Sequence, residues 1–365
     1  MKRTLVVIAA IGLLFTTQIA SAGGNTNLPQ EGSSDTFTLA AYGDWPYSLS
    51  LLAQAPALLN SINSDPQVHM VIHVGDIHGG NMPCTGVGLD PRPATADPNW
   101  NQTIFNIFQQ FQDPVIYTPG DNEWTDCHKT RAGSSGAPLN ELASIRSLFF
   151  AHPGQTLGQQ AIRLTTQAQK FDAAHPTDAQ FVENLRWQKL NVVFVTLNVP
   201  GSNNDGLPWN GGAGAFLNEP ARQQEVAERT AADMRWLQAA FEQAEAKQAG
   251  AVVVILQADL WDLSALAPGG DGLTGYRDLV QVLANLSIHF GRPVLLINGD
   301  SHIFEADHPL ADPLSVTGRI YGTLAVPNLT RLTVEGAIDA NEWLRLTVNP
   351  HSPEVFSWER IQYLP

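Results

Sequence analysis

The stretch HMVIHVGD, residues 69–76, decides the fold class, because a β-branched run typical of a buried strand ends there in a Gly-Asp pair. Other short apolar runs along the chain also end in a small residue followed by an acid: Asp44, Asp121, Asp259 and Asp300. Helical patterns separate these runs, the main ones at residues 49–62, 140–149, 223–247 and 276–290. Strands that alternate with helices predict crossover connections and a largely buried sheet. In the tail, alternating runs at 329–334, 344–348 and 355–358 indicate antiparallel strands that close a second sheet.

The acids that follow the strands predict a single site. The ligand crevice of an open α/β sheet lies at the carboxyl ends of its strands. We therefore expect five side chains to converge on one rim: Asp44, Asp76, Asp121, Asp259 and Asp300. Converged carboxylates repel one another, so they need protons or cations, and two divalent metal ions satisfy such a cluster. The alternative is that each Gly-Asp pair only makes a turn or caps a helix.

The blocks around these acids resemble those of the calcineurin-like metallophosphoesterase family, over residues 36–307. The family pattern runs Asp-x-His, Gly-Asp-x-x, Gly-Asn-His-Asp/Glu, a strand-end His, and Gly-His-x-His. By this resemblance, Asp44 is the first metal ligand and Asp76 the carboxylate that bridges two metals. The run GDNE, residues 120–123, falls on the third block, and the run GDSH, residues 299–302, falls on the last.

Several positions depart from the family pattern. Pro46 stands where the first block has its His, and Tyr47, which follows it, is similar to a Tyr ligand of the related purple acid phosphatases, although theirs lies in the second block. Asp121 and Asn122 replace the ligand Asn and the His that assists the leaving group. Gln257 or Asp259 replaces the strand-end His, and Asp300 replaces the first His of the last block. Only His302 remains as a family-type imidazole ligand.

The resemblance implies an α/β fold, a four-layer sandwich of two mixed β-sheets flanked by helices, and an enzyme that hydrolyses phosphate mono- or diesters. Its dinuclear metal site would act through a metal-bound hydroxide. The expected metal-site residues are Asp44, Asp76, Asp121, Gln257, Asp259, Asp300 and His302. An oxygen-rich set of ligands favours manganese, magnesium or calcium, with iron or zinc as alternatives.

The expected catalytic residues are Asn122, His78 and His128. An amide such as that of Asn122 cannot release a proton at neutral pH. Protonation of the leaving group must then come from His78, from His128 or from water. The run NNDG, residues 203–206, looks faintly like a calcium loop, but it lacks the later bidentate Glu because Gly212 stands in that place. We do not interpret it as a calcium site.

Two functions from other classes remain as alternatives. The missing histidines favour a metal-binding or carbohydrate-binding relative that is catalytically weak or inactive. A structural protein of the cell envelope could use the same fold as a scaffold. Metal content and turnover would separate these alternatives from an enzyme. The substrate, the choice between mono- and diesters, and the oligomeric state are not indicated by the sequence.

The ends and the overall charge indicate an exported protein that acts on small molecules. Residues 1–22 have the basic start, the short apolar core and the Ala-Ser-Ala end of a signal peptide, with cleavage near Ala22 into the periplasm or the medium. Residues 23–35 read as a flexible leader, and 36–365 as one domain with an insertion near 151–180. We expect no membrane anchor, because no later run is apolar enough to span a bilayer. A net charge of −15 argues against tight binding of nucleic acid and leaves a small phosphate ester as the expected partner.

The chain has two cysteines, Cys84 and Cys127, which follow the loops of Asp76 and Asp121. Export would place them where disulfides persist. If both loops flank one site, a bridge would pin them together. The alternative is two free thiols.

Overall fold

The computed structural model describes residues 35–84, 100–132, 137–209, 218–337 and 341–364. The predicted signal peptide, and the predicted leader except for Asp35, lie outside the described residues.

The fold is α/β, with two mixed β-sheets. The first has five strands in the order β12-β11-β1-β2-β3 and the second has seven in the order β4-β5-β6-β7-β8-β10-β9. The strands are β1 (Phe37–Tyr42), β2 (Val68–His73), β3 (Val115–Tyr117), β4 (Thr165–Thr166), β5 (Leu185–Lys189), β6 (Val192–Thr196), β7 (Ala251–Ile255), β8 (Val294–Asn298), β9 (Glu305–Asp307), β10 (Leu329–Thr333), β11 (Glu342–Val348) and β12 (Phe356–Gln362).

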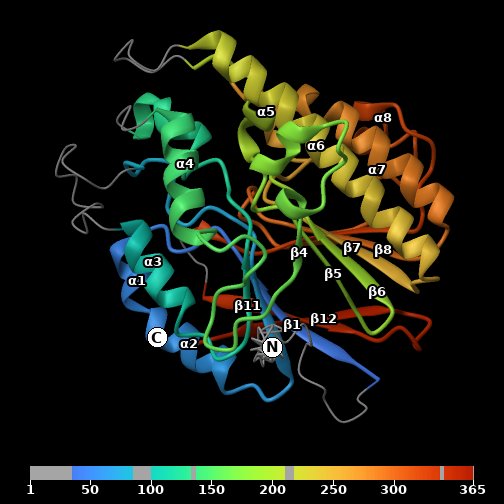
Figure 1. Cartoon of the computed structure of the whole chain (residues 1–365), viewed down its shortest axis with the longest axis horizontal. Helices are drawn as coiled ribbons and strands as arrows, with labels where there is room; N and C mark the ends of the chain where they lie inside the picture. The colour runs from blue at the N-terminus through green and yellow to red at the C-terminus, as the bar shows by residue number, and fades with distance from the viewer. Residues whose placement is uncertain (1–34, 85–99, 133–136, 210–217, 338–340, 365) are drawn as a thin grey trace, which may run out of the picture.

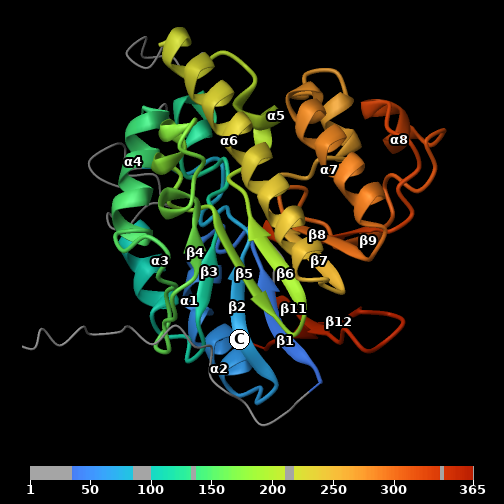
Figure 2. The same cartoon turned by 45° about the vertical axis from the view of Figure 1, so that its right-hand side comes forward.

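The α-helices are α1 (Leu49–Ala53), α2 (Ala55–Asn63), α3 (Trp100–Phe108), α4 (Pro138–Phe149), α5 (Gly201–Asp205), α6 (Glu219–Ala246), α7 (Arg277–Phe290) and α8 (Val316–Tyr321). Figures 1 and 2 show α1 to α4 on one side of the strands and α6 to α8 on the other. No α-helix within the described ranges is both long enough and apolar enough to cross a bilayer.

Three buried apolar clusters explain this layering. One cluster lies between the sheets and includes Leu39, Phe194 and Val253. A second joins the outer face of the five-stranded sheet to α1, α2, α3 and α4, and a third joins the outer face of the seven-stranded sheet to α6 and α7. Strands covered on both faces are expected to be apolar throughout, and β6 and β7 are buried at every position.

Two expectations of the sequence are corrected. The pattern at 49–62 is two helices, because α1 ends at the C-cap residue Gln54 and α2 begins at Ala55 with Pro56 in its first turn. The tail does not close a second sheet by itself. Instead β10 pairs in parallel with β8, while β11 and β12 pair antiparallel in the first sheet, next to β1. Alternating runs do not reveal which sheet a strand joins.

The predicted insertion at 151–180 carries the short strand β4, which pairs with β5 at the edge of the seven-stranded sheet. The helix predicted at 223–247 is α6, which begins four residues earlier at Glu219. The parallel strands matter most for the site. In the first sheet β1, β2 and β3 are parallel, and in the second β6, β7 and β8 are parallel. The loops that follow their carboxyl ends build the site described below.

Candidate metal centre

Four side chains of the predicted site stand on turns with a left-handed backbone. Non-glycine residues seldom adopt positive φ, and such residues are enriched at functional sites. The values of φ are 47° at Asp44, 58° at Asp76, 74° at Asp300 and 65° at His302. Each turn follows β1, β2 or β8 within four residues, so each side chain is directed by a tight turn anchored on a buried strand.

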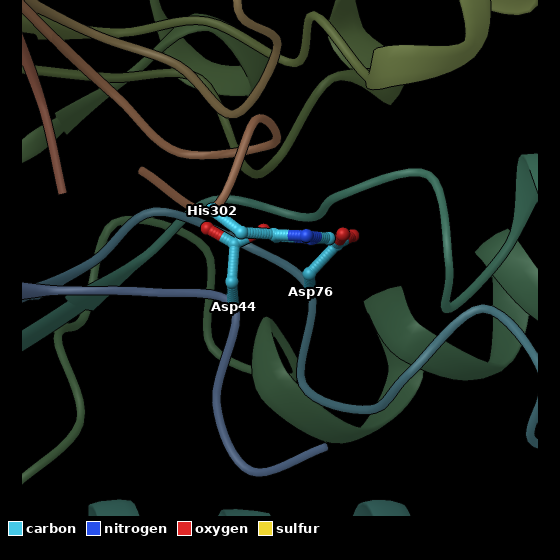
Figure 3. Close-up of side chains that lie close together, drawn as sticks. All are labelled: Asp44, Asp76 and His302. Atoms are coloured by element: carbon cyan, nitrogen blue, oxygen red, sulfur yellow. The ribbon is translucent and has the colours of Figure 1, made fainter. Parts of the chain in front are cut away.

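Four of the five carboxylates converge as the sequence predicts, and together with His302 they form two groups of close ligand atoms. Asp44, Asp76 and His302 make one group, and Asp76, Asp121 and Asp300 make the other. Within each group, one ligand atom per residue lies within 4.8 Å of the others. Figure 3 shows Asp44, Asp76 and His302 converging from separate loops. Asp76 belongs to both groups, which is the position that the sequence predicts for a bridging carboxylate.

Glycines allow the loops to approach one another this closely. A Cβ atom on Gly299 would lie 2.2 Å from an oxygen of Asp44, and one on Gly120 would lie 2.1 Å from an oxygen of Asp76. Only glycine leaves room at such distances. The Gly-Asp pairs therefore do more than make turns, because each of these glycines packs its backbone against an acid from another loop.

Tyr47 reaches the centre of the first group. Its hydroxyl donates to Asp76 Oδ2 at 2.6 Å, and it also lies 3.3 Å from Asp44 Oδ1 and 3.1 Å from His302 Nε2. The Asn122 amide donates to the same hydroxyl at 2.8 Å. The hydroxyl therefore contacts all three members of the group. Its position three residues after Asp44 indicated a role near the metal site. It was not predicted as a ligand, because the related Tyr ligand lies in the second sequence block of its family and Tyr47 follows the first.

Asn122 and Glu123 hold Asp76 from two sides. Asn122 Nδ2 donates to Asp76 Oδ2 at 2.7 Å, and its backbone N–H donates to Asp76 Oδ1 at 3.1 Å. Glu123, which is fully buried, accepts from the backbone N–H groups of Asp76 and Gly120 and from the hydroxyl of Tyr117. Burial raises the pKa of Glu123 to about 7, while those donors lower it. Glu123 thus fastens the loops of Asp76 and Asp121 together.

The electrostatics of the cluster fit a cation. Burial raises the pKa of Asp76 well above its usual range, and the charges of Asp121, Glu123 and Asp44 raise it further. Burial and the charges of Asp121 and Asp44 do the same to Asp300. Burial alone would lower the pKa of His302, but its hydrogen bond to Asp44 raises it. The charges of neighbouring carboxylates contribute to each of these shifts, and a divalent cation bound among them would offset their repulsion.

The remaining predicted ligands take different places. Gln257 is buried beside the cluster, where its Nε2 lies 3.3 Å from Asp121 Oδ1 and its Oε1 accepts from the backbone of Gly201 at 2.5 Å. The Asp259 carboxylate forms an ion pair with Arg331 at 2.9 Å and accepts from the Trp261 backbone. Asp259 therefore lies outside both ligand groups, although its own N–H donates to Asp300.

The two histidines predicted as acids are members of neither ligand group. His78 is 1% exposed, its Nδ1 lies 3.2 Å from the Gly79 carbonyl oxygen, and burial lowers its pKa to about 4. His128 is 4% exposed, with its ring 6.3 Å from that of Trp209. It lines a small cavity of about 260 Å³ beside the cluster. A role for either as a proton donor stays a prediction.

A larger cavity, of about 920 Å³, opens over the cluster. Its lining includes Asp76, Asp121, Asp300, His302, Tyr47 and Asn122, and none of its described lining residues is Lys or Arg. Ser202 lines both cavities and donates to Asp121 Oδ2 at 2.6 Å. Ser202 is not among the residues predicted from the sequence. It could have been predicted from its place in the loop after β6, because the other loops of the site also follow parallel strands.

The predicted disulfide is confirmed. Cys84 and Cys127 are bonded, with a Cα–Cα distance of 5.7 Å, and both are buried. The bridge joins the loop that follows Asp76 to the short 3-10 turn Thr125–His128, which follows Asp121. The disulfide is compatible with an exported protein.

Comparisons with known proteins give little. No family model matches the sequence, and no curated protein matches it. Among solved structures, a similar chain is described as "GAP50 the anchor in the inner membrane complex of Plasmodium". The two chains are 11% identical, the match covers 90% of each, and the TM-score is 0.38. We draw no functional conclusion from so distant a likeness.

Proposed function

We propose that this protein is a metal-dependent phosphoesterase of the calcineurin-like type, which hydrolyses phosphate mono- or diesters. One observation supports the proposal above all: Asp76 belongs to two adjacent groups of ligand atoms, at the strand ends and beneath a cavity. Asp44, Asp76 and His302 would hold one ion, and Asp76, Asp121 and Asp300 the other. Two divalent ions would supply Lewis-acid activation of water and of the phosphoryl oxygens.

The chain's own residues would orient the centre and the substrate. Tyr47 and Asn122 fix Asp76 through the hydrogen bonds described above, and Glu123 holds its backbone. Gln257 steadies Asp121. Because the cavity has no Lys or Arg among its described lining residues, binding of a phosphate group would depend on the metals. The ligands are mainly carboxylates, so we expect manganese, magnesium or calcium to be preferred to zinc.

The test begins with protein purified without chelator. Elemental analysis should find divalent metal, and metal-stripped protein should take up two ions per chain on titration. An aryl phosphate monoester and an aryl phosphate diester should then be hydrolysed only when metal is added back. No metal in the protein and no uptake would contradict the proposal.

A second candidate is a metal-binding protein of the envelope with little or no catalytic activity. The observation in its favour is that His302 is the only histidine among the described residues that line the large cavity, and it belongs to a ligand group. Metal uptake without hydrolysis of either ester, under any of the metals added, would favour this candidate over an enzyme.

A further inference from the structure

The segment α5 beside the cluster has an unusual backbone. Four consecutive residues, Ser202 to Asp205, have φ of 51°, 56°, 60° and 57°, so the turn winds in the left-handed sense. L-residues disfavour that sense because Cβ approaches the following carbonyl oxygen. Such a turn persists only where its surroundings hold it in place. Here the Gly275 N–H donates to Asn203 Oδ1 at 2.6 Å, and Arg229 donates to the Asn204 carbonyl and side chain.

The start of this turn is packed against two of the expected metal ligands. A Cβ atom on Gly201 would lie 2.5 Å from Asp300 Oδ1 and 2.9 Å from Asp121 Oδ2. The Gly201 N–H donates to Gln257 Oε1. The left-handed turn therefore brings backbone against the Asp76, Asp121 and Asp300 group and directs the next side chain, that of Ser202, toward it.

The Ser202 hydroxyl lies among three charged groups. Its Oγ is 2.6 Å from Asp121 Oδ2 and 2.8 Å from Asp126 Oδ1, and it accepts from Lys129 Nζ at 2.7 Å. A hydroxyl has one proton, so it can donate to only one of the two carboxylates. Lys129 also forms an ion pair with Asp126 at 2.8 Å. Because the Lys129 ammonium already neutralises the Asp126 carboxylate, we assign the single hydroxyl proton of Ser202 to the hydrogen bond with Asp121.

We propose that Ser202 is a positioning residue for the metal subsite made by Asp76, Asp121 and Asp300, where its hydroxyl orients the Asp121 carboxylate while Lys129 holds the hydroxyl. The inference rests on the proposed metal centre. Partners that orient a ligand in this way typically change metal affinity 10- to 100-fold. Ser202 sits on the side of Asp121, so its loss should weaken one of two binding events and spare the one at Asp44, Asp76 and His302.

Two substitutions separate the hydroxyl from the strained backbone. Ser202→Ala removes the hydroxyl but keeps the conformational free-energy cost of a positive φ. Ser202→Gly removes both the hydroxyl and that cost. Ser264→Ala is the matched control, because Ser264 lines the same cavity but its hydroxyl donates to Asp262, which belongs to neither ligand group. Metal-stripped wild type and all three variants are titrated with Mn²⁺ by calorimetry, and their unfolding in urea is measured without metal.

We expect two binding events in the wild type and in Ser264→Ala. In both Ser202 variants one event should weaken about tenfold or more while the other keeps its affinity. The Gly variant should be at least as stable in urea as the Ala variant. Wild-type affinities in the Gly variant would show that loss of the hydroxyl does not by itself weaken metal binding and would overturn the inference, as would equal weakening of both events. In either case the proposed metal centre would stand, whereas a wild type that binds no Mn²⁺ would overturn both.

Discussion

At the scale of single residues, Asp76 is the position on which the centre depends most. Its carboxylate belongs to both ligand groups, so Asp76→Asn removes charge from both. We expect the variant to lose uptake of two ions, with a fall in affinity beyond the 10- to 100-fold typical of a supporting residue. Elemental analysis after dialysis against Mn²⁺ measures this. Asp278→Asn is the control, since Asp278 is exposed on the first turn of α7, and equal metal content in both variants would contradict the assignment.

Asn122 leads to a prediction about leaving groups. Its amide is committed to Asp76 and Tyr47, and an amide cannot protonate a departing alkoxide. We therefore expect aryl esters to be hydrolysed faster than alkyl esters, because aryl oxides leave as stabilised anions. General acid catalysis is typically worth about a hundredfold or more, so the gap should be visible in kcat/KM.

Asn122→His should narrow that gap by improving alkyl esters selectively. The comparison needs metal-saturated enzyme, so that altered metal affinity is not mistaken for altered chemistry. Equal rates on aryl and alkyl esters in the wild type, unchanged in His78→Ala and His128→Ala, would show that the acid lies elsewhere or that another step limits the rate.

The residues that could be predicted are those whose signal is local. A strand that ends in Gly-Asp places a carboxylate at a known edge of the sheet. The convergence of Asp44, Asp76, Asp121 and Asp300 could therefore be predicted. Ser202 contacts a residue 81 positions away, and no local pattern carries such information. Tyr47 contacts Asp76, 29 positions away, and only its place three residues after Asp44 indicated it. Asp259 shows the converse case, because its strand-end position is right but Arg331 from β10 engages its carboxylate.

At the scale of elements, the disulfide ties together the two loops that follow β2 and β3. It closes a span of 43 residues, for which loop-closure entropy predicts a stabilisation of about 4 kcal/mol. We expect the double variant Cys84→Ser, Cys127→Ser to lose about that much unfolding free energy in urea, measured without metal. A reductant should destabilise the wild type and leave the double variant unaffected. An unchanged urea midpoint in the double variant would count against this role.

The first turn of α4 contains Glu141, which is buried. Burial raises its pKa to about 7, above the value of roughly 4.3 expected in the unfolded chain. Folding thus favours the protonated form, so this contribution to stability is present below about pH 4 and is lost as the pH rises through 7. Glu141→Gln should be more stable than the wild type at pH 8, by roughly 1–2 kcal/mol after allowance for solvent screening, and the difference should vanish near pH 4.

Urea unfolding of both proteins at a series of pH values checks this prediction. Glu354→Gln removes an exposed acid and serves as the control, for which we expect no such pH dependence. A difference between wild type and Glu141→Gln that stayed constant from pH 4 to pH 8 would mean that the carboxyl keeps an ordinary pKa in the folded protein.

Long or strongly amphipathic helices could be predicted well, as α6, with 28 residues, and α7 show. The wrong predictions concern which strand pairs with which. The strands β11 and β12 have the expected alternation, but the pairing of β11 with β1, and of β12 with β11, depends on which edge of which sheet remains open. That choice is made by packing across the whole chain.

At the scale of the whole molecule, the centre joins the two sheets, since Asp44 and Asp76 follow strands of one sheet and Asp300 follows a strand of the other. Ions that bind there should stabilise the entire fold. Mn²⁺ at a hundred times its Kd should add about 2.7 kcal/mol of unfolding free energy for each site. Thermal unfolding with Mn²⁺, compared with potassium chloride at matched ionic strength, measures the shift. Asp76→Asn should show little response, and a wild type that responds no more than this variant would argue against metal binding.

The pairing of β1 with β11 also bears on how the chain is made. Ala41 lies opposite Leu344, so the first strand of the described chain is flanked on one side by a strand from its far end. During synthesis that side of β1 stays unpaired until β11 has left the ribosome. Pairings between such distant segments form slowly. A nascent chain of this topology therefore cannot complete its five-stranded sheet before residues 342–362 have left the ribosome.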